Sequence, residues 1–344
     1  IGGILDATGS ATVNFLAVAD FTNGTLQTDC TTTLNFDADV SAYPAGANSL
    51  YDLSVDGIFV FPAADFTICN SLTITATATV TSAANRSISI TNNLTMNGIF
   101  NATNITGLSI GGAISTIVAA TWNTTANIDL TVNGTASSLS LPEEITALRR
   151  VTLSRPNGMT LNANLTRGED AASLAYSGYV LYISSGDFDI NGFITTLAHP
   201  VNRIYEAPSG GQIVVNTGGD GAYITTAVAG STRDEIVNSG IGVYELLGEP
   251  DNLTVKRFPK SKVIPNYSTT VARYYQISFS IGGPIARIKF EYDNTELNGN
   301  VATDLKIYEA TDDLFKFDLD SADLNENYPG TAKGITRGIR NGFS

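Results

Sequence analysis

The amino-acid sequence predicts an all-β protein whose main body is a β-solenoid, a right-handed parallel β-helix. Apolar and polar residues alternate in many short runs, which is typical of strands. Asn-Gly pairs at 97–98, 133–134, 157–158 and 191–192 indicate turns between these runs. Charged residues make up only 15% of the 344 residues, below the usual ~25%. Short strands that cannot bury their inner face alone are stable when they stack as coils.

Residues 1–70 alternate weakly, and we expect them to form a separate N-terminal segment. Strands are predicted at 11–18, 31–36 and 58–61, with turns such as Asn23-Gly24 between them. This segment would either cap the following array or pair with another subunit.

Residues 71–250 show the most regular pattern and form the predicted solenoid. The run 72–80 (LTITATATV) alternates strictly, and similar shorter runs follow at intervals, for example at 128–132 and 151–153. No exact repeat length emerges, so a tandem array of β-sandwich domains is the alternative fold. In a solenoid, Asn and Thr are expected to form ladders along the turns.

Residues 251–344 are predicted to form a small antiparallel, β-sandwich-like domain with a basic tail. The runs 274–281 and 286–292 are longer and have one polar face, which is typical of antiparallel strands. The tail carries Lys333, Arg337 and Arg340.

The charge is negative overall and unevenly distributed. The net charge is −14, and residues 1–140 contain nine Asp but only one base, Arg86. Nucleic acid is therefore excluded as an expected partner, because phosphate binding needs clustered Lys and Arg. No apolar run approaches the ~18 residues of a membrane span. An acidic front and a basic tail could attract each other between subunits; simple solvation of the tail is the alternative.

The start of the chain and its sequons bear on location. The chain begins Ile1-Gly-Gly without Met, and we expect a secreted or cell-surface product whose export signal has been removed. Ten Asn-X-Ser/Thr sequons are present, and Asn93, Asn101, Asn123 and Asn133 are candidates for glycosylation. We interpret most of the sequons as Asn turns beside Thr-rich strands.

Two cysteines, Cys30 and Cys69, have no neighbouring Cys or His, which argues against a metal site. In an exported protein they are expected to form a disulfide, and closing a loop of about 40 residues would contribute about 4 kcal/mol. Two buried free thiols are the alternative.

Two stretches resemble one known family. The strings LPEEITALRRVTL (141–153) and NGMTLNANLT (157–166) are similar to the repeat of large Bacteroidota cell-surface proteins, and ARIKFEYD (286–293) resembles the module that often follows those repeats. The resemblance covers about 139–310. It implies a β-helix repeat protein exported as type IX secretion cargo, of adhesin-like character. A fold-level resemblance transfers location better than activity.

The sequence offers no convincing catalytic constellation, so we predict that the protein is not an enzyme. Asp187 and Asp189 could form a carboxylate pair of a polysaccharide hydrolase, because they share one strand face. The tripeptide Arg287-Ile-Lys289 resembles one found in polygalacturonases, but the accompanying signatures are absent. His199 is the single histidine and precedes a proline, which favours a loop position.

Two weaker binding sites are candidates. Asp318, Asp320 and Asp323 alternate in a way that suits Ca²⁺, although a solvated acidic loop is the alternative and no other cofactor is expected. Trp122 and Tyr179 could stack on a glycan. Packing in the core or at an interface is the alternative, because a period of two places Tyr179 opposite Tyr182.

The sequence is compatible with three functions. The first is a structural subunit of an extracellular filament, sheath or surface layer, self-associating head to tail through strand edges and the chain ends 1–30 or 331–344. The second is a cell-surface adhesin or glycan-binding module that takes surface polysaccharide as partner. The third is a polysaccharide-degrading β-helix enzyme.

Overall fold

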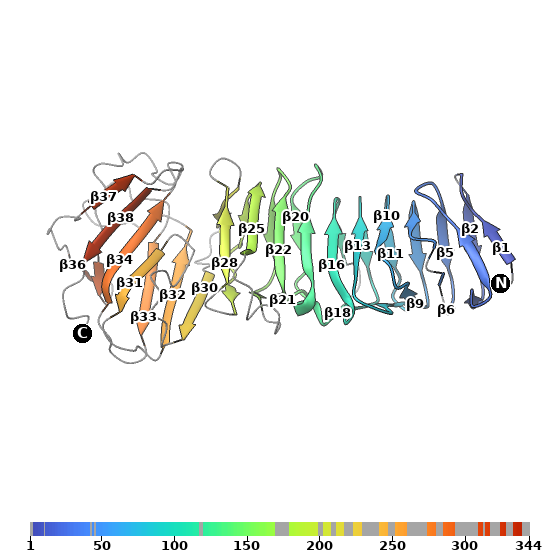
Figure 1. Ribbon diagram of the computed structural model, residues 1–344, viewed down its shortest axis with the longest axis horizontal. Coiled ribbons are helices and arrows are strands. Elements are labelled where there is room, and N and C mark those ends of the chain that lie inside the picture. Colours follow the sequence, from blue (N-terminus) through green and yellow to red (C-terminus); the bar gives the residue numbers. More distant parts are fainter. Residues whose placement is uncertain are drawn as a thin grey trace.

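The computed structural model is an all-β solenoid of about nine turns followed by antiparallel sheets (Figure 1). The predicted solenoid is confirmed, and the alternative of tandem β-sandwich domains is wrong. The N-terminus lies at one end of the stack, and the C-terminal sheets lie at the other. Each coil supplies one short strand to each of three parallel sheets.

The structure describes most of the solenoid and the paired strands that follow it. The described residues are 3–9, 11–41, 43–44, 46–116, 120–168, 179–198, 202–207, 211–216, 223–228, 241–246, 252–259, 274–279, 285–292, 309–311, 314–316, 324–327 and 333–338.

One sheet, here called the long sheet, runs along the solenoid through eight parallel strands. These are β7 (Ser49–Leu50), β10 (Phe66–Ile68), β13 (Arg86–Ile90), β16 (Ile105–Ile110), β19 (Asp129–Val132), β22 (Arg150–Ser154), β25 (Tyr179–Ser185) and β28 (Arg203–Glu206). In the first coils, β1 (Gly3–Asp6) and β4 (Gly24–Gln27) pair with each other in parallel.

The other two sides of the first coils are six-stranded parallel sheets. The second sheet contains β2 (Thr12–Phe15), β5 (Thr33–Phe36), β8 (Asp52–Val55), β11 (Leu72–Ile74), β14 (Leu94–Met96) and β17 (Ile114–Ser115). The third sheet contains β3 (Ala19–Asp20), β6 (Val40–Ser41), β9 (Ile58–Phe61), β12 (Thr79–Ser82), β15 (Ile99–Asn101) and β18 (Thr121–Asn123).

Later coils build the same sides with new sheets after a 3₁₀ turn, η1 (Thr125–Asn127). One contains β20 (Leu139–Leu141), β23 (Met159–Leu161), β26 (Phe188–Asp189) and β29 (Ile213–Val214). The other contains β21 (Ala147–Leu148), β24 (Leu165–Arg167), β27 (Thr195–Leu197) and β30 (Tyr223–Val228), and continues into β32 (Asn252–Phe258) and β33 (Tyr274–Phe279).

The coils differ in length, which is why the sequence shows no exact repeat. In-register partners lie 19 residues apart at Leu34 and Leu53 and 22 apart at Phe66 and Ile88. The distance grows to 30 residues between Thr152 and Tyr182. A β-coil keeps its cross-section while its loops change length, so the stacking survives where the periodicity does not.

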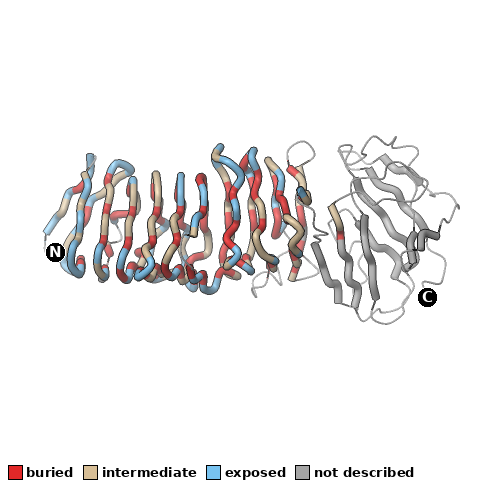
Figure 2. The backbone as a smooth tube through the Cα atoms, turned by 180° about the vertical axis from the view of Figure 1, so that it is seen from behind, coloured by how far each residue is buried: buried red, intermediate tan, exposed pale blue. Residues whose placement is uncertain are grey.

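The core consists of in-register columns of inward side chains, visible as buried positions alternating along each coil (Figure 2). Burying one such Leu or Ile is worth about 1.5–3 kcal/mol relative to leaving it exposed. The alternation predicted from the sequence therefore becomes a continuous apolar interior. One column of the second sheet runs through Val13, Leu34, Leu53, Leu72, Leu94 and Ile114.

Polar ladders hold the turns, as expected. Asn70 donates to Asp52 (2.8 Å), and Asn92 donates to Asn70 (3.1 Å), so one ladder crosses three coils. Asn157-Gly158 and Asn191-Gly192 form turns in which both glycines have positive φ, 72° and 80°, a conformation that glycine adopts at little cost.

A buried arginine secures another turn. Arg155 is fully buried, and its guanidinium donates to the carbonyls of Gly111, Gly112, Asn133 and Ser137 at 2.5–3.0 Å. Desolvation lowers the pKa of Arg155 from its ordinary value. The side chain links three successive coils by satisfying carbonyls that no strand pairs.

The boundary predicted at residue 70 does not separate two folds. β8 pairs in parallel with β11, and β9 pairs with β12, so coils before and after residue 70 belong to the same sheets. Residues 3–68 are the first coils of the solenoid and not a separate cap.

The pairing changes from parallel to antiparallel after β30, which pairs with β27 on one side and antiparallel with β32 on the other. A further antiparallel sheet contains β31 (Ile241–Leu246), β34 (Ile285–Tyr292), β38 (Lys333–Gly338) and β37 (Leu324–Asn327), and β35 (Glu309–Thr311) pairs with β36 (Leu314–Lys316). Antiparallel pairing of the C-terminal strands follows the prediction. Among the described residues, no helix is long and apolar enough to cross a membrane.

Candidate functional site

The first coil of the solenoid is open on its outer side. β1, β2 and β3 are the terminal strands of their sheets, and within the described part of the chain no strand pairs with their outer edges. An edge strand presents unpaired backbone N–H and C=O groups, which can pair with another strand. Three such edges lie together at one end of the molecule.

The side chains of this coil show the same openness. The inward positions Val13 and Phe15 are only half-buried, whereas their partners one coil inside, Leu34 and Phe36, are 0% and 1% exposed. The Phe15 ring stacks on Phe36 with 4.8 Å between ring centroids. One face of Phe15 is therefore packed, and the next coil that would cover the other face is absent from the described residues.

Three apolar side chains of the first coil are highly exposed: Ile4, Leu16 and Val18, at 72%, 78% and 66%. They flank the open edge strands β1, β2 and β3. An apolar group beside an unpaired strand edge is typical of a surface that another β-structure covers.

The open end is also strongly acidic. Residues 1–70 contain eight Asp and no Glu, Lys or Arg. Hydrogen bonds from Thr8, Thr22 and Thr31 lower the pKa of Asp6, Asp20 and Asp29 respectively. Each of these carboxylates accepts both the N–H and the O–H of a threonine two residues later. The carboxylates are thus ionised at neutral pH while they hold the turns.

The opposite end of the solenoid is closed by an ion pair. Glu206 lies opposite Ile183 in the long sheet and so ends a column of core side chains. Its carboxylate accepts two hydrogen bonds from Arg257 of β32, at 2.6 and 3.0 Å, and Arg257 is 1% exposed. A charged pair joins the last coil to the antiparallel sheet.

A cluster of tyrosines lies on the outer face of the long sheet. Tyr182 and Tyr205 are in register on β25 and β28 and stack with 4.6 Å between centroids and an interplanar angle of 11°. The Tyr179 ring contacts both of these rings, with centroid distances of 5.9 Å to Tyr182 and 5.4 Å to Tyr205. Tyr179 and Tyr182 are each 37% exposed. We call Tyr179, Tyr182 and Tyr205 the tyrosine cluster.

This arrangement corrects the predicted glycan-stacking pair. Trp122 is buried and packs on Phe100 at 5.1 Å, so its ring belongs to the core. Tyr179 does not lie opposite Tyr182, because the pairing register shifts between Tyr179 and Leu181. That β-bulge turns two adjacent residues, Val180 and Leu181, inward and leaves both tyrosines outside.

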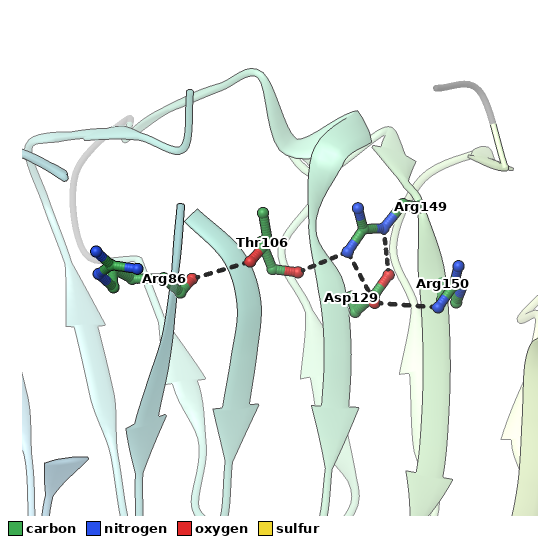
Figure 3. Close-up of polar contacts among 5 residues, drawn as sticks. All are labelled: Arg86, Thr106, Asp129, Arg149 and Arg150. Carbon is green, nitrogen blue, oxygen red and sulfur yellow. Dashed lines mark hydrogen bonds and ion pairs between the residues drawn. The ribbon is translucent and has the colours of Figure 1, made fainter. Parts of the chain in front are cut away.

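A chain of polar contacts crosses the long sheet near the start of β16, β19 and β22 (Figure 3). Arg149 binds Asp129 through two hydrogen bonds, at 2.6 and 2.8 Å, and also donates to the carbonyl of Thr106. Arg150 contacts the same carboxylate at 3.4 Å. Two guanidinium groups thus contact one carboxylate.

The carboxylates considered for hydrolysis have different environments. Asp187 is exposed, whereas Asp189 is 8% exposed and accepts the N–H groups of Asn191 (2.8 Å) and Asn216 (3.2 Å). Asp189 therefore holds a turn. Arg287 and Lys289 lie on β34 of an antiparallel sheet, and His199 lies outside the described residues.

The predicted Ca²⁺ ligands Asp318, Asp320 and Asp323 also lie outside the described residues. Within the described ranges, no group of three or more His, Cys, Asp or Glu residues is placed to hold a metal ion.

The predicted disulfide between Cys30 and Cys69 is confirmed, with 5.4 Å between the Cα atoms. Among the candidate sequons, Asn93 and Asn123 are exposed, and Asn93 accepts the N–H of Ala113 at 2.9 Å. Asn101 accepts the N–H and O–H of Thr103, and Asn133 donates to Ser109 at 3.1 Å. Glycosylation of these sites stays a prediction.

The chain matches no protein-family model, no curated protein and no solved structure.

Sequence reasoning missed three contributors to these sites. Tyr205 was not singled out, because its loop-rich neighbourhood hid the in-register pairing with Tyr182. The Glu206–Arg257 pair joins residues 51 positions apart, and a local sequence pattern cannot predict such a contact. Arg149-Arg150, an adjacent basic pair in a chain with few charges, was a signal that could have been followed.

Proposed function

We propose that this protein is a non-catalytic structural subunit of an extracellular filament, sheath or surface layer. In this assembly, the open first coil of one copy is covered by the C-terminal end of the next. The observation that carries the proposal is the contrast between Phe15, half-buried, and Phe36, 1% exposed, at equivalent positions of neighbouring coils. A partner strand over β1–β3 would complete the burial that inner coils already have.

The charge distribution favours head-to-tail contact over contact between two N-terminal ends. Two first coils would bring eight Asp each together without a base in residues 1–70, and like charges in contact disfavour association. Residues 251–344 carry twelve bases and twelve acids, so that end does not repel the acidic coil. A head-to-tail contact that does not close generates a filament.

The C-terminal partner is an edge strand and not the tail segment 331–344. β38 (333–338) is paired on both sides, by β34 and β37, so its backbone is already used. β33 and β37 are terminal strands of their sheets. We therefore propose that these edges receive the first coil of the next subunit.

The disulfide supports the proposed location outside the cell, where conditions are oxidising. The Cys30–Cys69 disulfide is of a kind that persists mainly in secreted proteins and at cell surfaces. Export by a type IX route belongs to the same proposal. A sorting domain in the precursor would support it.

Electron microscopy and light scattering of the purified chain test the assembly. We expect filaments or concentration-dependent oligomers at low salt. Leu16→Asp with Val18→Asp should abolish them, because these exposed side chains lie in the contact. Ile99→Asp is the matched control, since Ile99 is 39% exposed in the middle of the stack. Monomers at every concentration and salt, or equal effects of the two variants, would contradict the proposal.

A further inference from the structure

The outer face of the third sheet carries uncharged side chains at two outward positions on each of β9, β12, β15 and β18. We call these positions the third-sheet strip. Its first column runs in register through Ile58, Thr79, Ile99 and Thr121, and its second column contains Val60, Thr81, Asn101 and Asn123. The strip lies on the side of the solenoid, away from the open first coil, where β3 of the same sheet carries the exposed Asp20.

The first column of the strip alternates between large and small side chains. Ile58 is 50% exposed and Ile99 is 39% exposed. The smaller Thr79 lies in register between them, and Thr121 follows Ile99 on the next strand. The surface therefore has two apolar knobs, each followed one strand further along by a shallower position.

We propose that the third-sheet strip is a second self-association surface, which binds the same strip of another copy of this chain in the antiparallel direction. A two-fold axis parallel to the strands, between β12 and β15, reverses the order of the coils and keeps the first columns aligned. Ile99 of one copy then faces Thr79 of the other, and Ile58 faces Thr121. Each knob meets a shallow position, so the two surfaces are complementary, as a symmetric contact between identical patches requires.

A parallel arrangement of the two copies lacks this fit. With a two-fold axis along the solenoid, each coil would face the same coil of the other copy. The level of Ile58 and Val60 would meet itself, and so would the level of Thr79 and Thr81. The large side chains would hold the sheets apart where the small ones lie, and such gaps lose van der Waals contacts.

The charge distribution favours a second copy of this chain as the occupant. The net charge is −14, and like charges in contact disfavour association. On the strip, two acidic chains can meet without bringing carboxylates together. The outward positions of the second sheet include Asn35, Ser54, Thr73 and Thr95, and burial of these polar side chains removes little apolar surface from water.

The two asparagines of the second column belong to candidate glycosylation sequons. In the antiparallel arrangement Asn101 faces Thr81, and an amide group can donate a hydrogen bond to a hydroxyl. A glycan on Asn101 or Asn123 would cover the strip. The proposal therefore requires both sequons to be unoccupied in the assembled protein, in keeping with their interpretation as turn residues.

The small size of the strip determines its role. Eight side chains per copy are far fewer than the ~20–30 residues per side of a standard interface, so two free chains should associate only weakly. Subunits linked in the proposed filament present many strips, and repeated weak contacts between two filaments act together. The sideways binding of filaments thus rests on the proposed function, whereas the contact between two strips can be tested without it.

The first test is cysteine cross-linking of the full chain with Leu16→Asp and Val18→Asp, which remove the end-to-end contact. A chain that also carries Ile58→Cys is mixed at high concentration with one that carries Thr121→Cys. The reagent is a bis-maleimide that spans about 10 Å, the distance between packed sheets. We expect several-fold more dimer from the mixture than from either chain alone. Ile194→Cys mixed with Thr121→Cys is the matched control, because Ile194 is 39% exposed and lies outside the strip.

The second test is electron microscopy of filaments without these cysteine changes. The unaltered chain should form filaments that associate side by side. Ile58→Asp with Ile99→Asp should leave separate filaments, because carboxylates would then face the partner strip. Ile194→Asp should leave the side-by-side association unchanged.

The outcomes separate this contact from the end-to-end assembly. Excess dimer from the mixture without any filament would support the strip contact and contradict the proposed filament. Equal cross-linking of the Ile58→Cys chain alone, or no more dimer than in the Ile194→Cys control, would overturn the strip contact, and a strip that binds a different molecule predicts the latter result. Separate filaments of the unaltered chain, or side-by-side filaments that survive both Asp changes, would also overturn it.

Discussion

The two ends of the solenoid are finished in different ways. At the C-terminal end, the core column that includes Ile183 stops at Glu206, and Arg257 of the antiparallel sheet neutralises it. At the N-terminal end, core columns of the second sheet stop at Val13 and Phe15, which are half-buried. A stacked array can either cap its last coil or continue into another. In the described residues, one end of the stack carries the Arg257–Glu206 ion pair, and the other presents strand edges with no paired strand.

The difference also shows in what stabilises each end. The first coils rely on turn hydrogen bonds between Asp and Thr and on the Cys30–Cys69 bond. The last coil relies on a buried ion pair and on the antiparallel pairing of β30 with β32. Perturbations should therefore act at one end without reaching the other, because each coil contacts mainly the coils next to it.

Phe36→Ala should cause the largest loss of stability among the changes considered. Phe36 is 1% exposed, and removing a buried aromatic side chain costs about 4 kcal/mol of stability. Phe15→Ala removes the same group from the open coil and should cost only ~1–2 kcal/mol. Hydrogen exchange of the first coils measures both. Equal losses would show that the first coil is as well packed as the second.

Loss of the disulfide should cause the second-largest loss of stability. Replacing Cys30 and Cys69 by Ala frees a loop with a sequence separation of 39 residues, for which chain entropy gives about 3–4 kcal/mol. We expect faster hydrogen exchange in the coils before β11 and unchanged exchange at β25 and β28. A loss of protection that spreads to β28 would mean that the solenoid unfolds as one unit.

Glu206→Gln should weaken the opposite end by about 3 kcal/mol, because it leaves the buried guanidinium of Arg257 without its carboxylate. Combining it with Arg257→Met should restore much of this stability, since the buried charge is gone. Thermal unfolding and exchange at β28 and β32 are the measurements. If the double variant is no better than the single one, the pair matters for packing more than for charge.

Acid should destabilise the N-terminal end, and we expect this loss of stability to be smaller than the three described above. The pKa values of Asp6, Asp20, Asp29 and Asp56 are lowered in the folded chain by hydrogen bonds from threonines. A lowered folded-state pKa gives stability that is present above the ordinary value of 3.8 and is lost as the pH falls through the folded value.

Hydrogen exchange between pH 6 and pH 3 checks this acid effect. The first coils should lose protection below about pH 4, whereas β22 and β25 should change less. Asp29→Asn should reduce the pH dependence and keep the turn, because Asn101 makes the same pair of bonds to Thr103. Uniform acid sensitivity along the stack would contradict a local origin.

The sequence by itself determined the strand content, the inward and outward residues, several turns and the disulfide. An alternation with a period of two indicates which side chains share a face. Asn-Gly pairs indicate turns whose φ values glycine can adopt. Val151 and Leu153, read as inward from alternation alone, are both buried.

The tertiary structure decided where the chain bends and which distant residues meet. The run 72–80 alternates without interruption, yet it divides into β11 and β12 with a corner at 75–78. At that corner the hydroxyls of Thr75 and Thr77 bind Asp56 of the preceding coil. Alternation cannot show such a corner, because corner residues also alternate.

The bulge that exposes Tyr179 and the contact of Glu206 with Arg257 likewise depend on neighbouring coils or sheets. Both features depend on how neighbouring strands stack, and a local sequence pattern does not show which strand lies beside another. The sequence therefore determined how each coil is built, and the stack decided which ends and faces remain available for partners.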